Sequence, residues 1–369
     1  MKKYRYKYIP ILVFLLYACS SNLQGDLLEI AVNTNRDGSL QISEITEEMT
    51  AIELELTDES LINSDMIVRI IITENNIIVA ESSIVGLSKV LVFNQDGTFV
   101  RSIGSRGQGP GEFNIISNIA FDDKSNRLFM VNSQPNKIIC YDLEGKFVKE
   151  SRFNCPITDI NYINGELLLN CLCRRTSNHA SNVLYRMNES FQIIDSCIRW
   201  ENYYERATWM DLNLFKANIV QNNTFVYLYS NDIYPKQYAP EVKVLRDTLY
   251  RVEDNQLIPE LKLKFKNDGF DSAGDKIIDL FNIWRSSRYV FAVYMTDNKT
   301  RYYFCYDTKT GKGYNIPDGY TDDINGIEKP VSIRPLHTDS ETFYYWHTHM
   351  KPDDREEPNP TLYIIKLKK

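Results

Sequence analysis

Two histidines separated by one residue are the first candidates for metal chemistry. His347 and His349 would face the same side of a strand, because side chains at positions i and i+2 point the same way. Asp353 or Asp354 could add a carboxylate if the chain bends back after Pro352. A solvated strand end beside a turn is the commoner role for such a pair, so we assign no metal ligand from the sequence.

Covalent and acid–base catalysis have no recognisable motif in this chain. The Gly-x-Ser-x-Gly turn that exposes a nucleophilic serine does not occur in the sequence. Spacing alone cannot select a catalytic pair among 49 aspartates and glutamates. The catalytic residues are therefore left unassigned.

A cluster of glycines between residues 104 and 113 invites comparison with phosphate-binding loops. Backbone N–H groups in glycine-rich loops can bind phosphate. Here no Lys-Ser or Lys-Thr follows, and residues 114–118 lead into a strand where a dinucleotide site needs a helix. We interpret the glycines as a tight connection whose backbone needs positive φ angles.

The seven cysteines form no recognisable disulfide framework. We interpret the six that follow Cys19 as buried thiols, with disulfide bonding and metal ligation as the alternatives. Cys171 and Cys173 would share one strand face, which suits packing better than a bond between them. The six are Cys140, Cys155, Cys171, Cys173, Cys197 and Cys305.

The N-terminus has the composition of an export signal. A basic segment at residues 1–7 precedes an apolar stretch at 9–16 that is short for a membrane span. Residues 16–19, Leu-Tyr-Ala-Cys, resemble the bacterial lipobox. We expect removal of residues 1–18, lipid on Cys19 and a tether over residues 19–26. An ordinary signal peptide or an uncleaved anchor is the alternative.

Charge and tether composition bear on partners and location. Loss of residues 1–18 removes four basic side chains and changes the formal net charge from −7 to −11. This acidity argues against nucleic acid as a partner, and the lipid makes the membrane the expected one. Residues 20–26 lack the acidic run of a surface-export signal. We therefore expect a cell-envelope protein on the periplasmic side of the outer membrane.

The remainder of the chain has the pattern of strands. Short alternating runs bounded by Asn, Asp and Gly dominate, aromatic residues are abundant, and almost no stretch has a helical period. After residue 26 there is no linker rich in Pro, Gly or Ser. The sequence predicts one all-β domain over residues 27–369.

A repeated strand–turn–strand unit predicts the architecture. The clearest copies, residues 93–100 and 141–148, each turn on a glycine. Weaker copies begin at 185, 250 and 306, and the last strand begins near 363, at spacings typical of four-stranded blades. We predict a six-bladed β-propeller. Residues 27–32 or 51–56 would close the ring by pairing near residues 362–367.

Residues 99–113, FVRSIGSRGQGPGEF, resemble the signature of the NHL-like six-bladed β-propeller lipoproteins of Bacteroidota. Segments 52–62, 247–252 and 359–363 support a resemblance over about residues 27–369, whereas Trp284-Arg285-Ser286 lacks the acidic residue expected before the serine. The resemblance implies a propeller in which this motif has a structural role. The motif residues are Gly104, Gly107, Gly109, Pro110, Gly111, Glu112 and Phe113.

Aromatic clusters are the candidate ligand-binding residues. Two clusters lie in segments without alternation and mixed with charged residues, so we expect them on loops at the mouth of the ring, either lining a ligand site or packing blades together. Residues 343–346 are expected in a buried strand instead. The candidates are Trp200, Tyr203, Tyr204, Trp209, Tyr234 and Tyr238.

These features predict an envelope-anchored binding or scaffold protein that recognises a glycan, a peptide or a partner protein. The alternative is a metal-dependent hydrolase or lyase, similar to lactonases, that holds a divalent cation in the central channel. Only the alternative implies a cofactor. It would be favoured by three or more carboxylate or amide side chains converging at the mouth of the channel.

Overall fold

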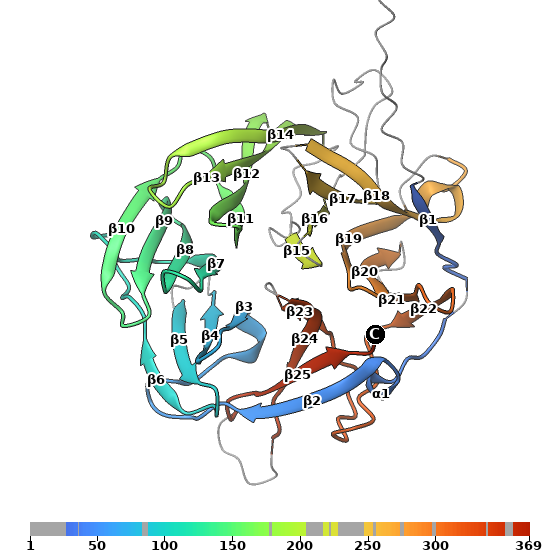
Figure 1. Ribbon diagram of the computed structural model, residues 1–369, viewed down its shortest axis with the longest axis horizontal. Helices are drawn as coiled ribbons and strands as arrows, with labels where there is room; N and C mark the ends of the chain where they lie inside the picture. The colour runs from blue at the N-terminus through green and yellow to red at the C-terminus, as the bar shows by residue number, and fades with distance from the viewer. Residues whose placement is uncertain are drawn as a thin grey trace, which may run out of the picture.

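The computed structural model describes residues 27–35, 37–82, 88–176, 179–203, 217–220, 223–227, 247–253, 256–273, 277–296, 300–336, 339–350 and 357–369. Cys19 and the predicted tether lie outside the described residues. Within them the chain forms six sheets arranged around a central axis (Figure 1). This is the all-β propeller arrangement that the repeats predict.

Sheets 1 to 3 each use four consecutive strands, ordered from the centre outward. Sheet 1 contains β3 (Ile67–Ile72), β4 (Asn76–Glu81), β5 (Lys89–Asn94) and β6 (Phe99–Ser102). Sheet 2 contains β7 (Ile116–Asp122), β8 (Arg127–Ser133), β9 (Asn136–Asp142) and, on the outside, β10 (Phe147–Arg152). Sheet 3 contains β11 (Ile157–Ile163), β12 (Glu166–Thr176), β13 (His179–Met187) and β14 (Ile193–Tyr203).

Sheets 4 and 6 each include one strand from the N-terminal segment, whereas sheet 5 uses four consecutive strands. Sheet 4 contains β15 (Ala217–Val220), β16 (Asn223–Tyr227), β17 (Thr248–Glu253), β18 (Gln256–Lys264) and β1 (Leu28–Ala31). Sheet 5 contains β19 (Ile278–Arg285), β20 (Tyr289–Thr296), β21 (Arg301–Asp307) and β22 (Lys312–Pro317). Sheet 6 contains β23 (Arg334–Leu336), β24 (Asp339–His347), β25 (Thr361–Leu367) and β2 (Thr46–Glu53).

Among the described residues, helical structure is confined to single turns. These are α1 (Ile42–Ile45) and the 3₁₀ turns η1 (Ser64–Met66) and η2 (Lys266–Gly269). None of the described helices is long and apolar enough to cross a membrane. Each predicted strand–turn–strand unit forms the third and fourth strands of its sheet. Residue 363 lies on the third strand of sheet 6.

The N-terminal segment runs along the outer edges of sheets 4, 5 and 6 (Figure 1). β1 pairs in parallel with β18, so the prediction that residues 27–32 join the last blade is wrong; Ile30 packs in the cluster between sheets 4 and 5 instead. β2 pairs antiparallel with β25, with Ile52 opposite Leu362, so the pairing predicted for residues 51–56 is confirmed for residues 51–53. Between them, Asp37 and Gln41 form bridges to Asn315 and Thr321.

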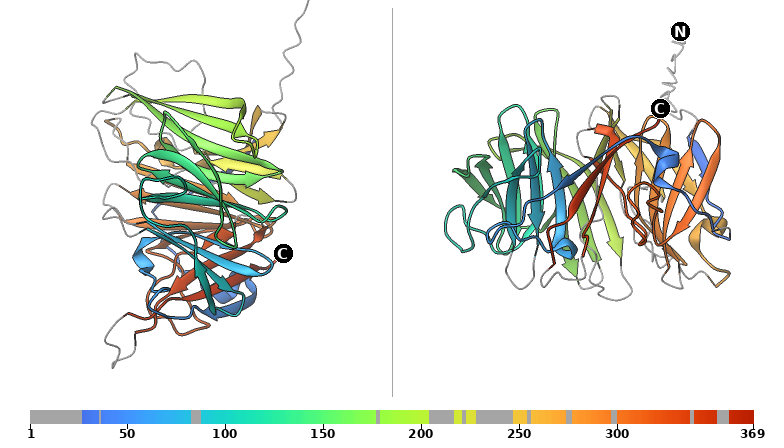
Figure 2. Two further views of the ribbon diagram at one scale, coloured as in Figure 1. Left: turned by 90° about the vertical axis from the view of Figure 1, so that its left-hand side faces the viewer. Right: turned by 90° about the horizontal axis from the view of Figure 1, so that it is seen from below.

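The described sheets pack face against face around the axis (Figure 2). No ladder of hydrogen bonds joins one described sheet to the next, so they do not form a continuous closed barrel. Apolar clusters fill the spaces between neighbours instead. Between sheets 5 and 6, the rings of Phe291 and Phe343 lie 4.8 Å apart, and the cluster between sheets 6 and 1 joins Leu362 to Ile70. This burial is the main source of stability.

The glycine-rich segment connects sheets 1 and 2 and supports the structural interpretation. Gly111 has φ +78°, and a Cβ there would meet the Phe147 ring at 2.9 Å. Its N–H donates to Glu150 Oε2 at 2.9 Å, and its carbonyl accepts from the Tyr141 hydroxyl. Glu112 turns back to accept from the Gly109 N–H at 2.8 Å. The motif fixes the connection to the outer strands of sheet 2.

The prediction that the cysteines are buried thiols holds for only some of them. Cys155 and Cys173 form a disulfide with Cα atoms 5.0 Å apart, which corrects that interpretation for both residues. The bond forms because Cys155 lies just before β11, beside β12. Cys140, Cys171 and Cys305 are buried free thiols, as expected. Cys171 and Cys173 are not bonded to each other, also as expected.

Candidate ligand site in the central space

Only two of the six aromatic residues predicted to bind a ligand lie within the described residues. Trp200 and Tyr203 lie on β14, paired with Asn182 and His179 of β13. The expectation that they lie on loops at the mouth of the ring is therefore wrong, because the β13–β14 hairpin extends further than the side-chain pattern indicates. Tyr204, Trp209, Tyr234 and Tyr238 are outside the described residues. Phe343, Tyr344 and Tyr345 are buried on β24, which confirms the strand predicted there.

The histidine pair lies at the end of β24. The His347 and His349 rings are 4.8 Å apart, and His349 Nε2 is 2.6 Å from the Tyr363 hydroxyl. Burial, followed by the neighbouring His349, lowers the pKa of His347. Asp353 and Asp354 lie outside the described residues. Within the described part, no group of three or more His, Cys, Asp or Glu side chains is placed to hold a metal ion.

Polar residues occupy matching positions on the innermost strands. In sheets 1, 2, 3 and 5 such a residue follows a β-bulge. An isoleucine comes directly after it in each case. This repeated polar residue followed by isoleucine is the sequence signal that could have revealed these positions. Sheets 4 and 6 also carry a polar residue on the first strand, Asn218 as the second residue of β15 and Arg334 as the first residue of β23. The residues are Arg69, Asn118, Asp159, Asn218, Asn282 and Arg334.

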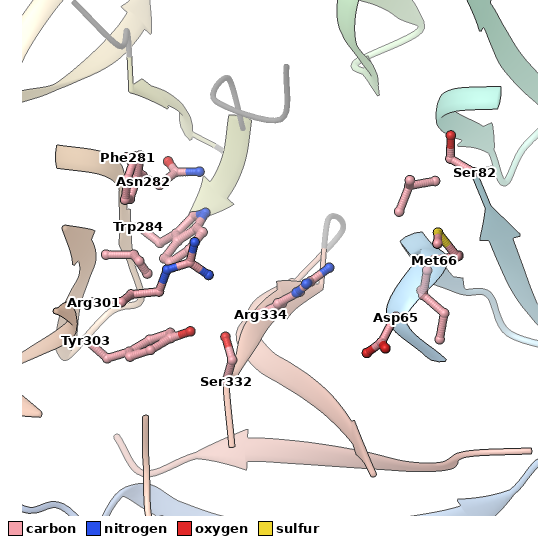
Figure 3. Close-up of a pocket in the computed structure, with 13 residues that line it drawn as sticks. Asp65, Met66, Ser82, Phe281, Asn282, Trp284, Arg301, Tyr303, Ser332 and Arg334 are labelled. Atoms are coloured by element: carbon pink, nitrogen blue, oxygen red, sulfur yellow. The ribbon is translucent and has the colours of Figure 1, made fainter. Parts of the chain in front are cut away.

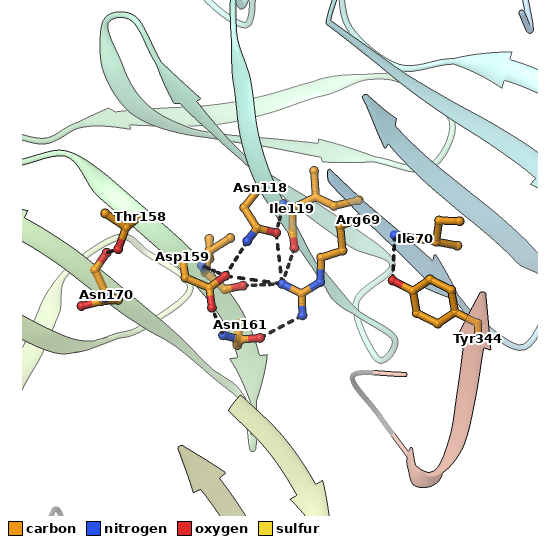
Figure 4. Close-up of polar contacts among 10 residues, drawn as sticks. Arg69, Ile70, Asn118, Ile119, Thr158, Asp159, Asn161, Asn170 and Tyr344 are labelled. Atoms are coloured by element: carbon orange, nitrogen blue, oxygen red, sulfur yellow. Dashed lines mark hydrogen bonds and ion pairs between the residues drawn. The ribbon is translucent and has the colours of Figure 1, made fainter. Parts of the chain in front are cut away.

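Arg69 joins three sheets through its guanidinium (Figure 4). Its Nη1 donates to Asn118 Oδ1 at 3.2 Å and to the backbone carbonyls of residues 119 and 160 at 3.0 and 2.8 Å. Its Nη2 donates to Asn161 Oδ1 at 2.8 Å, and Asp159 Oδ1 lies 3.8 Å from Nη1. Asp159 also accepts from the amides of Asn118 and Asn161.

This network bears on metal chemistry in the channel. One carboxylate and two amides do converge, as the metal-dependent alternative requires, but they converge on a guanidinium. Arg69 supplies the positive charge that balances Asp159, and its N–H groups use the oxygens that a hard cation would need. The arrangement therefore gives the alternative no support.

A pocket of about 320 Å³ lies between sheets 1, 5 and 6 (Figure 3). Its size is in the range of small-molecule sites. The pocket residues come from β3 and η1 of sheet 1, from β19, β20 and β21, and from the start of sheet 6. The polar and aromatic ones are Asp65, Ser82, Phe281, Asn282, Trp284, Arg301, Tyr303, Ser332 and Arg334.

Hydrogen-bond donors dominate the polar atoms of this pocket. Trp284 is 6% exposed, and its indole N–H is buried without a hydrogen-bond partner among the described residues. Asn282 Oδ1 accepts from the Ile283 N–H at 3.0 Å, and Figure 3 shows the amide nitrogen turned toward the pocket. The hydroxyl of Tyr303 points the same way. A buried donor without a partner costs free energy in the folded protein.

Two guanidiniums reach into the same space (Figure 3). Arg301 lies over the Phe281 ring at 5.8 Å, and Arg334 lies over the Trp346 ring at 4.4 Å. Within the described residues, neither lies within ion-pair distance of a carboxylate. Trp346 is itself held by its N–H, which donates to the Ser64 carbonyl at 3.2 Å. The aromatic rings therefore fix the direction of the cations without neutralising them.

The fold is that of a β-propeller, and comparison with known proteins places the chain within a family. A family model described as "Domain of unknown function (DUF4934)" matches residues 27–366, so the chain belongs to this family. No curated protein matches its sequence.

Two solved structures from Bacteroides resemble it. A protein of Bacteroides fragilis NCTC 9343, described as exported, aligns with a TM-score of 0.65 and 20% identity over 93% of this chain and 100% of that chain. A member of the duf4221 family from Bacteroides vulgatus ATCC 8482 aligns with a TM-score of 0.49 and 9% identity over 88% of this chain and 97% of that chain. At such identity the first likeness shows the fold alone.

Proposed function

We propose that this protein is an envelope-anchored β-propeller that binds a ligand in the pocket between sheets 1, 5 and 6. One observation carries the proposal: two guanidiniums face the pocket beside the buried Trp284 N–H, and among the described residues neither guanidinium has a carboxylate partner and the N–H has no acceptor. Such groups are costly to leave unsatisfied in a folded protein and are usual in binding sites. The ligand would be part of a glycan, a peptide or a partner protein.

Location at the envelope rests on the N-terminal residues. The basic and apolar segments before Cys19 support export and lipidation, and the similar Bacteroides fragilis protein is described as exported. We propose an NHL-like lipoprotein of the outer membrane that faces the periplasm. Labelling cells with a fatty-acid analogue should mark the wild-type chain and leave Cys19→Ser unmarked. Equal labelling of both would contradict the anchor.

Closure of the ring is part of the proposal. β2 is the outermost strand of sheet 6, and the same segment continues into sheet 1, so its pairing with β25 would hold the ends of the chain together. A chain lacking residues 27–53 should unfold at lower urea concentration than one lacking only residues 19–26. Identical unfolding of the two would argue against this closure.

Binding is tested with the full mature chain against panels of glycans, peptides and envelope extracts. Ligand capture by wild type that is lost in Trp284→Phe supports the central pocket. Loss only in Trp200→Ala/Tyr203→Ala would instead place the site at the aromatic residues of β14. If wild type captures no ligand from any panel, the proposed function is wrong.

A further inference from the structure

We propose that the ligand of the central pocket is a small acid, held by a carboxylate, sulfate or phosphate group between Arg301 and Arg334. The inference rests on the proposed function and names the chemical class of its ligand. It concerns the pocket of about 320 Å³ between sheets 1, 5 and 6, which fits a group of the size of one sugar ring better than a folded partner.

The first argument is the balance of donors and acceptors. Guanidiniums, an indole N–H and the Asn282 amide nitrogen are donors only. Tyr303, Ser82 and Ser332 add hydroxyls that donate or accept. The single carboxylate in the pocket lining is Asp65, which lies on the far side from Arg301 (Figure 3). A ligand group that meets the donors must carry several acceptor oxygens.

The second argument is charge. The chain has a formal net charge of −7, and several other arginines in its described part pair with acids, as Arg288 does with Asp307 at 2.7 Å and Arg186 with Glu166 at 2.7 Å. Two guanidiniums that face one pocket without such a partner repel each other. An anion between them removes this repulsion and gains charge-assisted hydrogen bonds.

The third argument is orientation. The planar guanidinium matches the geometry of carboxylate, sulfate and phosphate oxygens. Arg334 is fixed by the Trp346 ring, and Arg301 by the Phe281 ring, so little side-chain entropy is lost on binding. Asp65 at the other side would repel an anion and accept from a hydroxyl. The predicted ligand is therefore acidic at one end and hydroxylated at the other.

The test uses glucuronate, glucose 6-sulfate and glucose 6-phosphate as probes, with glucose as the neutral match. Binding to the full mature chain is measured by calorimetry at constant ionic strength. At least one acidic probe should bind with saturation while glucose does not. The most effective probe identifies the anionic group. Arg301→Gln/Arg334→Gln should weaken its binding roughly 100-fold or more, and Trp284→Phe roughly tenfold.

The control is Arg106→Gln/Arg152→Gln, which removes the same charge from exposed positions outside the pocket. It should bind as wild type does. The proposal is overturned if no acidic probe binds, or if both double variants lose affinity equally. Capture of a neutral ligand that depends on Trp284 and not on the two arginines would overturn the anionic class and leave the proposed function standing.

Discussion

The Arg69 guanidinium lies 3.8 Å from the Asp159 carboxylate, although one residue belongs to sheet 1 and the other to sheet 3. Sheet 2 lies between them, and its Asn118 amide donates to the same carboxylate. The side chain of Asp159 is 1% exposed and that of Arg69 is 14% exposed. Polar groups thus connect the inner strands of these sheets. Further from the axis, apolar clusters pack neighbouring sheets against each other.

Removing this guanidinium should be strongly destabilising. Arg69→Met leaves the Asp159 charge buried without a cation, so we expect a loss of about 3 to 5 kcal/mol in the free energy of unfolding. Arg127→Met is the control, because Arg127 pairs with Asp142 while 35% exposed and should cost less than about 1 kcal/mol. Urea unfolding at pH 7 measures both. If both substitutions lowered the free energy of unfolding equally, burial of the Arg69–Asp159 pair would not explain the effect.

The glycine-rich connection gives a prediction about steric fit. Gly111 and Gly165 have φ of +78° and +87°, but a Cβ at Gly165 would meet no atom within 4 Å. Gly165→Ala should therefore cost only the backbone penalty of about 1 to 2 kcal/mol. Gly111→Ala should add about 1 to 3 kcal/mol through overlap with Phe147. A thermal unfolding series that finds the two variants equal would show that this overlap is relieved.

The disulfide should contribute to stability. Cys155 and Cys173 are 18 residues apart in sequence, and closing a loop of this size is worth about 3 kcal/mol in the chain-entropy account. Cys155→Ser/Cys173→Ser should lose that amount in chemical denaturation. Peptide mapping of the exported protein without reduction is the direct check, and a map with both residues as free thiols would refute the bond.

The buried thiols should be unreactive in the folded protein. Burial raises the pKa of Cys140 to about 11 and that of Cys171 to about 12, and the thiolate is the reactive form. Iodoacetamide at pH 8 should leave both residues unmodified until denaturant is added. Mass spectrometry of the alkylated peptides gives the answer, and rapid labelling of either residue without denaturant would contradict its burial.

Asp307 gives a prediction about pH. Hydrogen bonds from Arg288 hold its pKa well below the usual range, against the opposing effect of burial. Because the folded pKa is lowered, this carboxylate stabilises the fold above its unfolded pKa of about 3.9, and the contribution is lost as the pH falls through the folded value.

Asp307→Asn should therefore destabilise the protein by about 1.5 to 3 kcal/mol at pH 7 and by progressively less below pH 4. Denaturant unfolding at several pH values measures the difference from wild type. Asp58→Asn, at an exposed position, is the matched control and should show no such difference. If the loss of unfolding free energy in Asp307→Asn stayed constant down to pH 2, Asp307 would not have the lowered pKa that we assign to it.

The six units and the pairing of residues 51–53 with the last strand could be predicted because their signals are local. A turn at residues 96–97 needs a glycine and flanking strands, and both are visible in a short stretch of sequence. The glycine motif was likewise interpreted correctly from its surroundings. The limits of strands were less predictable: β14 continues to Tyr203 because of its pairing with β13, which leaves no mark on the side-chain pattern.

The sequence by itself determined the repeated all-β architecture, since turn residues and alternation act within about ten positions of the chain. Only the tertiary structure decided where chemistry could occur. Arg301 and Arg334 are on different sheets, Asp65 precedes β3, and only the ring arrangement brings these residues to one pocket. The Cys155–Cys173 bond and the contacts of Arg69 arose the same way. A site assembled by packing of distant strands depends on register and on burial, and neither is encoded in the spacing of the residues that form it.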